Sequence, residues 1–427
     1  MTPELRRTLG VFDAVVIGLG SMVGAGIFAA LGPAAAAGGS WLLVGLALAA
    51  AVAYCNAMSS ARLAALYPSS GGTYVYGRER LGDFWGYLAG WAFVVGKTAS
   101  CAAMALTVGS YAWPEHSRAV AVAAVVVLTA VDYGGVRKSA LVTRVIVAVV
   151  LAVLAALAVT LAVSDAADPG RLAPGGGTGP GGGTGPGGGT GPGGVLQAAG
   201  LLFFAFAGYA RIATLGEEVR DPARTIPRAV PLALGAALAV YAAVAAAALA
   251  VLGAAGLGAA EAPLAAAAEA AGADWLGPVV RTAAVVAALG SLLALILGVS
   301  RTTLAMARDG HLPRGLAAVH PRFRVPHRAG LAVGAVVAVV AATVDVRGAI
   351  GFSSFGVLVY YAVANASAWT LPSRAARVTA GCGLTGCLVL ALSLPAVSAI
   401  AGTGVLAVGA VLYALRRRHD GGGGASA

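Results

Sequence analysis

The chain has 427 residues, of which 59% are hydrophobic and 11% are charged, and its formal net charge is +11 at pH 7. A soluble globular domain carries about 25% charged residues, so this composition excludes an ordinary soluble domain and indicates a protein that crosses a membrane many times. The positive charge does not require a nucleic-acid partner, because Lys and Arg retained in cytoplasmic loops account for it in a membrane protein.

Twelve apolar runs are long enough to cross a bilayer, which takes about 20 residues of helix. Alanine and leucine supply most of their helix propensity. We therefore predict an all-α membrane protein with about 12 transmembrane helices in a lipid bilayer. The predicted spans are residues 13–33, 40–66, 82–110, 117–132, 139–163, 195–215, 229–253, 276–304, 329–345, 348–371, 378–395 and 397–415.

The Lys and Arg residues are divided unequally between the two sides of this arrangement. With the N-terminus inside, 22 of the 28 lie on the inner side, and four lie outside, namely Arg118, Arg171, Arg281 and Arg347. Loops rich in Lys and Arg stay in the cytoplasm. We predict a multi-pass protein of the plasma membrane with both termini in the cytoplasm.

Residues 175–192 are three copies of Gly-Gly-Gly-Thr-Gly-Pro, a repeat that has no apolar face to bury. It predicts a disordered linker on the outer side, between the first five helices and the rest. The expected segments are a cytoplasmic N-terminus (1–12), a first group of helices (13–163), the linker (164–194), a second group (195–371), helices 11 and 12 (378–415) and a disordered cytoplasmic tail (416–427), with 13–415 forming one membrane domain.

The first predicted helix contains four glycines, Gly18, Gly20, Gly24 and Gly26, close to Ser21. Each glycine costs a helix roughly 0.5–1 kcal/mol relative to alanine, so the helix is expected to break at membrane depth. A dinucleotide-binding loop is excluded, because a strand, a soluble helix and a following acidic residue are missing. Two interpretations remain open: an unwound substrate site, or close helix packing through the glycines.

The sixth helix predicts a second break. Its apolar first half meets Gly208 and then Arg211, and a polar segment follows. Helices 1 and 6 each open a group of five helices, and breaks at matching positions of two halves indicate a transporter site near the membrane midplane. Lys97 in helix 3 is a further charged residue at membrane depth, where charges are usually functional.

Four stretches together resemble the amino acid permeases of the amino acid–polyamine–organocation superfamily. They are Gly20-Ser-Met-Val-Gly-Ala-Gly-Ile-Phe28, Tyr67-Pro-x-x-Gly-Gly-x-Tyr74, Phe203-Phe-Ala-Phe-Ala-Gly-Tyr209 with Glu217-Glu-Val-Arg-Asp-Pro-Ala-Arg-Thr-Ile-Pro227, and Ser300-Arg-x-x-x-Ala-Met-Ala-Arg-Asp-Gly-x-Leu-Pro313. The resemblance implies two inverted five-helix repeats, broken helices 1 and 6, and two extra helices. It also implies an amino acid substrate carried by alternating access.

The resemblance assigns roles to both breaks. The substrate carboxylate would meet the second half of helix 1, where a helix N-terminus stabilises an anion; the residues are Ser21, Gly24, Ala25 and Gly26. A branched side chain at Gly26 is expected to block this approach. The substrate amine would meet backbone carbonyls of Met22, Phe204 and Ala207. Gating and specificity would fall to Phe204, Tyr209, Ala210 and Arg211.

These residues say less about the side chain of the substrate and about the coupling ion than about the binding of the substrate's amine and carboxylate. Some relatives carry an acidic side chain at the position of Ala210, so its absence favours a neutral amino acid over a cationic one or a polyamine. The helix 5 lysine of some proton-coupled relatives is replaced by Val150. Lys97 is the remaining coupling candidate, since desolvation favours its neutral form; the alternative is a structural ammonium bound to helix-end carbonyls. Coupling to protons is expected, and symport, export and exchange all remain open.

Other classes of protein fit the sequence poorly. The histidines lie in loops or at helix ends, and we find no nucleophile elbow, metal-ligand spacing or nucleotide-binding loop. A membrane-embedded enzyme would need clustered polar groups at membrane depth, where the sequence offers Lys97 and Arg211. We therefore expect a secondary transporter that is not an enzyme, with no cofactor and no metal. The sequence does not determine an oligomeric state.

Overall fold

The computed structural model describes residues 9–24, 26–67, 71–135, 140–173, 192–213 and 219–422, and it contains no β-strand within them. The helices of the predicted spans are α1 (Val11–Met22) with α2 (Gly26–Gly38), α3 (Leu42–Leu66), α5 (Asp83–Ala112), α6 (Ser117–Tyr133), α7 (Ala140–Ala162), α8 (Pro192–Phe206) with η4 (Ala207–Tyr209) and α9 (Ala210–Ala213), α10 (Pro222–Ala259), α12 (Leu276–Arg308), α13 (His327–Thr343), α14 (Val346–Trp369), α15 (Arg374–Ser393) and α16 (Ala396–Gly422). The shorter helices are η1 (Gly39–Trp41), α4 (Thr73–Leu81), η2 (Pro114–His116), η3 (Pro169–Leu172), α11 (Pro263–Ala270) and η5 (Arg314–Ala317).

Nine helices in the described ranges are long and apolar enough to cross a membrane, and shorter apolar helices at Val11–Met22, Gly193–Tyr209 and His327–Thr343 accompany them. The prediction of an all-α membrane protein is confirmed. Several helix boundaries differ from the prediction. Helix α10 continues past a kink at Gly253 (φ +66°) to Ala259, and α16 continues to Gly422. The side chain of Arg416 donates a hydrogen bond to the Gly310 carbonyl (2.6 Å), which anchors the part of α16 that follows the predicted span. The predicted linker repeat at 175–191 and the last five residues lie outside the described part of the chain.

The helix contacts have the pattern of two related groups of five. Helix 1 packs on helices 6 and 7 through α2 with α8 and α1 with α10, and helix 6 packs on helix 2 through α8 with α3. Helix 6 is the counterpart of helix 1 in the second group, and helix 7 is the counterpart of helix 2. The contact of helix 1 with helix 7 therefore corresponds to the contact of helix 6 with helix 2. Helices 3 and 8 (α5 and α12) and helices 4 and 9 (α6 and α13) pair in the same way. Because five is an odd number of crossings, the second group begins on the opposite side, which makes the repeat an inverted one.

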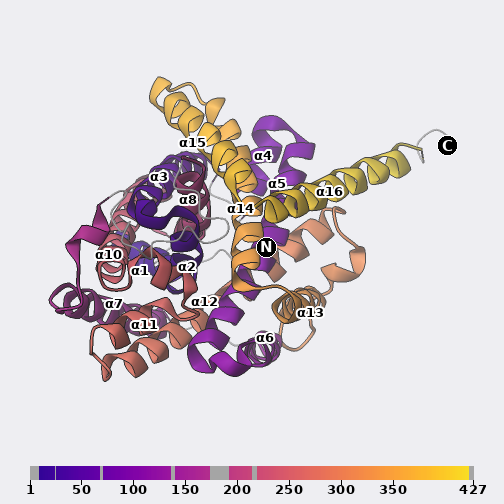
Figure 1. Ribbon diagram of the computed structural model, residues 1–427. Helices are drawn as coiled ribbons and strands as arrows, with labels where there is room; N and C mark the ends of the chain where they lie inside the picture. Colours follow the sequence, from indigo (N-terminus) through magenta and orange to yellow (C-terminus); the bar gives the residue numbers. More distant parts are fainter. Residues whose placement is uncertain are drawn as a thin grey trace.

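Helices α5 and α14 cross at the centre of the bundle, where they are largely buried (Figure 1). Their backbones touch at Gly96 and Gly356: a Cβ added to Gly356 would lie 2.9 Å from the Gly96 Cα. One turn further along, the hydroxyls of Ser100 and Ser353 lie 2.5 Å apart. Small residues of this kind allow close packing between helices in a membrane. The crossing fixes the face of α5 that carries Lys97.

Two of the stretches that carry the family resemblance meet on the predicted cytoplasmic side. The Tyr74 hydroxyl of α4 donates a hydrogen bond to the Asp309 carboxylate and lies 2.9 Å from His311 Nδ1. Burial lowers the pKa of His311, which favours its neutral form at physiological pH. The loop after helix 2 is thereby tied to the end of helix 8.

The Gly96–Gly356 crossing yields a stability prediction. Gly356→Ala should lower the free energy of unfolding by about 1–3 kcal/mol, because the new methyl overlaps the backbone of α5. Gly298→Ala on α12 is the control: no atom lies within 4 Å of its added Cβ, so a gain of up to about 1 kcal/mol in helix propensity is expected. Thermal unfolding of both purified variants in detergent checks this. Equal melting temperatures would contradict the tight crossing.

Candidate functional site

Helix 1 is interrupted between α1 and α2. Helix α1 ends at Met22, Val23 and Gly24 form a turn, and α2 begins at Gly26. Ala25, one of the predicted carboxylate ligands, lies outside the described residues. The first N–H groups of a helix have no acceptor within that helix, so the start of α2 presents donors at the break. The Ser21 hydroxyl donates a hydrogen bond back to the Ile17 carbonyl (3.0 Å), so it must turn from that carbonyl before it can donate to a carboxylate, which only accepts.

Helix 6 is interrupted at the same place in space. Helix α8 ends at Phe206, and a single 3₁₀ turn, η4, leads into α9. A Cβ on Gly208 would overlap the Ser21 carbonyl and lie 2.7 Å from the Met22 nitrogen. The two breaks are therefore in direct backbone contact, and only glycine at position 208 permits it.

The glycines of helix 1 serve close packing as well as the break. A Cβ on Gly26 would lie 2.6 Å from the Ala205 Cα, and one on Gly24 would lie 2.7 Å from the Ser291 Cβ of α12. Close helix packing through the glycines, one of the two interpretations left open by the sequence, therefore applies, and the unwound substrate site stays a prediction. The space in front of the Gly26 Cα holds the backbone of α8, so a branched side chain there would first force the two broken helices apart. A clash with the substrate, the reason expected from the sequence, stays a prediction.

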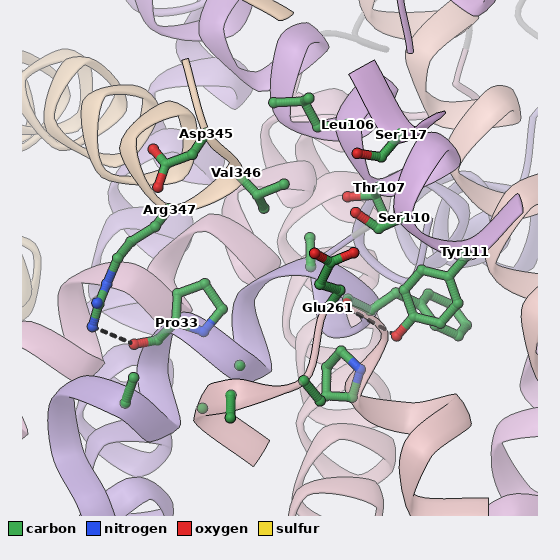
Figure 2. A pocket seen from close by; sticks show the side chains of 18 of the residues that line it. Pro33, Leu106, Thr107, Ser110, Tyr111, Ser117, Glu261, Asp345, Val346 and Arg347 are labelled. Carbon is green, nitrogen blue, oxygen red and sulfur yellow. Dashed lines mark hydrogen bonds between the residues drawn. The ribbon is translucent and has the colours of Figure 1, made fainter. Parts of the chain in front are cut away.

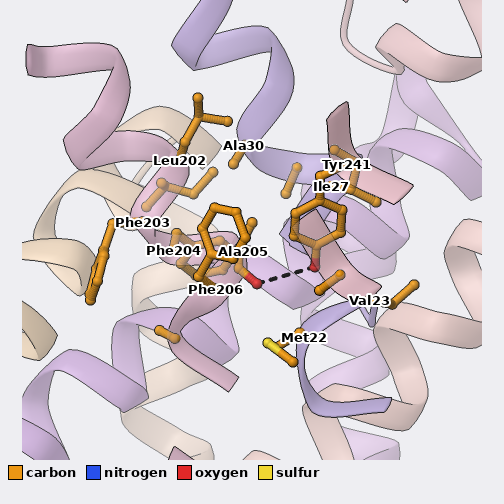
Figure 3. Close-up of a cluster of buried hydrophobic side chains, with 14 of the residues drawn as sticks. Met22, Val23, Ile27, Ala30, Leu202, Phe203, Phe204, Ala205, Phe206 and Tyr241 are labelled. Atoms are coloured by element: carbon orange, nitrogen blue, oxygen red, sulfur yellow. Dashed lines mark hydrogen bonds between the residues drawn. The ribbon is translucent and has the colours of Figure 1, made fainter. Parts of the chain in front are cut away.

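Apolar side chains enclose the two breaks (Figure 3). Met22 and Phe204 are both buried, at 1% and 7% exposure, so Phe204 faces the interior of the bundle. The Tyr241 hydroxyl donates a hydrogen bond to the Ala205 carbonyl (3.2 Å), which satisfies one of the acceptors at the C-terminal end of α8. This shell surrounds the unwound backbone with apolar side chains.

Lys97 reaches the break of helix 6. Its ammonium nitrogen lies 3.4 Å from the Ala207 carbonyl oxygen, and the Tyr361 hydroxyl of α14 donates to the same oxygen at 3.5 Å. Tyr209 stacks on Tyr361 with ring centroids 5.1 Å apart. Lys97 is only 6% exposed. Ala207 was predicted to receive the substrate amine, and the structure gives it two donors from the protein itself.

The other predicted specificity residues are placed differently. Tyr209 is fully buried, whereas Arg211, at the start of α9, is exposed. The side chain of Ala210 is outside the described part of the structure. Sequence reasoning missed Tyr361 and Ser291, both of which lie inside apolar spans. The signal available in the sequence was a residue with a hydroxyl group inside an apolar span.

A cavity of about 390 Å³ opens beside α2 (Figure 2). Phe28 and Tyr111 form part of its wall, and the Tyr111 hydroxyl donates to the Phe28 carbonyl (3.2 Å) while accepting from the Leu264 N–H (3.4 Å). Its charged lining residues are Arg118, Glu261, Asp345 and Arg347. Arg118 and Arg347 belong to the predicted outer side. The cavity therefore leads from that side to the third residue of α2.

In the described ranges, no group of three or more His, Cys, Asp or Glu residues is arranged to hold a metal ion.

Two broken helices in contact, inside a bundle of membrane-spanning helices and next to a polar cavity, define a multi-pass membrane transporter. The chain belongs to the amino acid permease family, whose sequence profile matches residues 9–415. It is 70% identical to an uncharacterized transporter of Mycobacterium tuberculosis, over 97% of this chain and 92% of the relative. A branched-chain amino acid permease and a methylthioribose transporter of Bacillus subtilis are 25% and 28% identical, over 98% of this chain and 94% and 95% of their own lengths. The chain is thus a transporter and not an enzyme.

The contact of α2 with α8 yields a prediction at Gly26. Gly26→Val should abolish transport and lower the melting temperature, because its side chain overlaps the Ala205 backbone and separates the two breaks. Gly235→Val on α10 is the matched control, since nothing lies within 4 Å of its added Cβ. Uptake by proteoliposomes and thermal unfolding are measured together. Wild-type uptake by Gly26→Val would refute the role of this contact.

Proposed function

We propose that this transporter moves an amino acid across the plasma membrane by alternating access, with both termini in the cytoplasm. The observation that carries the proposal is the contact between the breaks of helices 1 and 6. Broken backbone at membrane depth needs polar partners, and a zwitterion supplies partners for both kinds of helix end. The geometry that supports this is the approach of Gly208 to Ser21 and Met22.

The substrate carboxylate binds at the start of α2. The dipole and the free N–H groups of a helix N-terminus favour an anion there. Its ligands are the Ser21 hydroxyl and the backbone of Gly24, Ala25 and Gly26. The amine binds at carbonyls of Met22, Phe204 and Ala207, where the last C=O groups of α1 and α8 lack partners within their helices. Recognition by backbone leaves the substrate side chain free to vary.

A neutral amino acid is favoured as the substrate. The residues proposed to gate and select it are Phe204, Tyr209, Ala210 and Arg211. Ala210 offers no carboxylate to a cationic side chain, and Arg211 is a fixed positive charge. The branched-chain amino acid permease among the relatives supports a neutral substrate. A cationic amino acid is the second candidate, because a human cationic amino acid transporter is 28% identical over 84% of this chain.

Transport is coupled to protons through Lys97. A charged side chain at the membrane centre costs roughly 2.5–3.5 kcal/mol on insertion scales, so a lysine is retained there for a use. Its ammonium lies next to the break in helix 6, 3.4 Å from the Ala207 carbonyl oxygen that is proposed to bind the substrate amine.

A thermal-shift screen of the purified protein against the common amino acids and polyamines tests the substrate. A ligand at 100 times its dissociation constant adds about 2.7 kcal/mol to the stability of the folded state. We expect a neutral amino acid to raise the melting temperature. Stabilisation by cationic ligands alone would overturn the neutral preference, and stabilisation by no amino acid would overturn the substrate class.

Lys97→Ala should impair pH-driven transport more than substrate binding, because it removes the proton carrier and leaves the backbone ligands in place. Uptake into proteoliposomes with and without a pH gradient, alongside a binding assay, separates the two effects. Thr98→Ala is the neighbouring control, since its hydroxyl bonds within α5 to the Val94 carbonyl. An unchanged pH dependence in Lys97→Ala would make Lys97 a structural residue.

A further inference from the structure

With the substrate bound, more hydrogen-bond donors would compete for the Ala207 carbonyl oxygen than it has lone pairs to accept them. A carbonyl oxygen accepts two hydrogen bonds. The Lys97 ammonium and the Tyr361 hydroxyl both lie within reach of this oxygen, at 3.4 and 3.5 Å. The proposed function brings a third donor, the substrate amine, to the same atom. One donor must leave when the substrate arrives.

Charge decides which donor leaves. Two ammonium groups about 4 Å apart in a partly polar protein site repel each other enough to change an equilibrium constant roughly a thousandfold. A neutral tyrosine hydroxyl adds no such repulsion. The substrate amine therefore competes with the proton on Lys97 far more strongly than with Tyr361.

The surroundings of Lys97 offer no compensating anion among the described residues. The Cys101 thiol, one turn further along the same helix, is a neighbouring titratable group. From the elements packed against it come the hydroxyls of Tyr209 and Tyr361, with Tyr360 in contact with Tyr361. Arg211, four residues beyond Ala207, keeps its charge and so does not exchange a proton. A second buried cation would remain unneutralised here.

We infer that the substrate amine and the proton on Lys97 exclude each other at the Ala207 carbonyl, so that the transporter exchanges protons for its amino acid. This inference rests on the proposed function and selects exchange from the three modes of coupling that the sequence left open. An N–H bond of the Lys97 ammonium breaks, its proton passes to water on the side to which the site is open, and the substrate ammonium takes its place. The number of buried ammonium groups stays constant.

Reciprocity gives this competition a measurable form. If the substrate lowers the affinity of Lys97 for a proton, the proton lowers the affinity for the substrate by the same factor. Binding should release about one proton per amino acid, and the apparent affinity should rise with pH by up to tenfold per unit.

Calorimetric titration of the purified full-length protein tests the inference. Each common L-amino acid is titrated at one pH into phosphate and into Tris buffer, whose different ionisation enthalpies reveal proton release, and the titration is repeated across a pH series. The amino acid that binds should release a proton. The matching carboxylic acid without an α-amino group should release none, because it brings no ammonium to the Ala207 carbonyl.

Variants assign the proton to Lys97. Lys97→Met should bind the amino acid without proton release and with little pH dependence. Lys97→Arg should bind it at least tenfold more weakly, because its charge cannot be lost. Tyr361→Phe removes the uncharged donor and should keep the proton release, so it is the control for loss of a donor to the Ala207 carbonyl without loss of a charge.

The outcomes separate the two proposals. An amino acid that binds with proton uptake, or with no proton exchange, overturns this inference and leaves the proposed function standing. Equal release with the deaminated acid, or release that persists in Lys97→Met, also overturns it. Binding of no amino acid overturns the proposed function and this inference together.

Discussion

The contact between Gly208 and the end of α1 is the constraint on which the rest of the structure depends. Lipid offers no hydrogen bonds, so unwound backbone at membrane depth has to be enclosed by protein or water. Because the two breaks lie together, one set of surrounding protein groups can enclose both. The packing of helix 1 on helices 6 and 7, and of helix 6 on helices 1 and 2, holds the breaks in contact.

The crossing of α5 and α14 provides the side chains around this backbone. Close approach at Gly96 and Gly356 brings Lys97 from one helix and Tyr361 from the other to a single carbonyl. In the proposed function, the backbone groups and Lys97 have different tasks because their chemistry differs. Backbone groups suit the constant part of an amino acid, while a lysine adds a charge that can be switched by a proton.

The two faces of the bundle differ in the described ranges. On the predicted outer side, a cavity with charged residues reaches α2. On the predicted inner side, the backbone N–H of Arg220 donates to the Leu9 carbonyl (2.9 Å), Asp13 pairs with Arg144, and α4 is tied to the end of helix 8. Alternating access requires such unequal faces, because a site open to both sides at once would conduct. The assignment of inside and outside remains a prediction from the distribution of Lys and Arg.

The sequence by itself determined the class of protein, the helices and the location of both breaks. Length, hydropathy and glycine content act locally, so they can be read from a window of the chain. Lys97 was identified for the same reason, since a charge in an apolar run is a local anomaly. The resemblance of four stretches to amino acid permeases anticipated the family. The residue roles at the breaks remain predictions.

Only the tertiary structure decided what these residues touch. Lys97 and Ala207 are 110 positions apart in the chain, and Ala207 and Tyr361 are 154 apart, so no local pattern couples them. The same limit applies to Gly26. Its sequence context does not tell whether the missing side chain makes room for a substrate or for a neighbouring helix. The structure places Ala205 against it. Sequence determined where the chain must break, and packing between distant helices determined which groups share the space that the break creates.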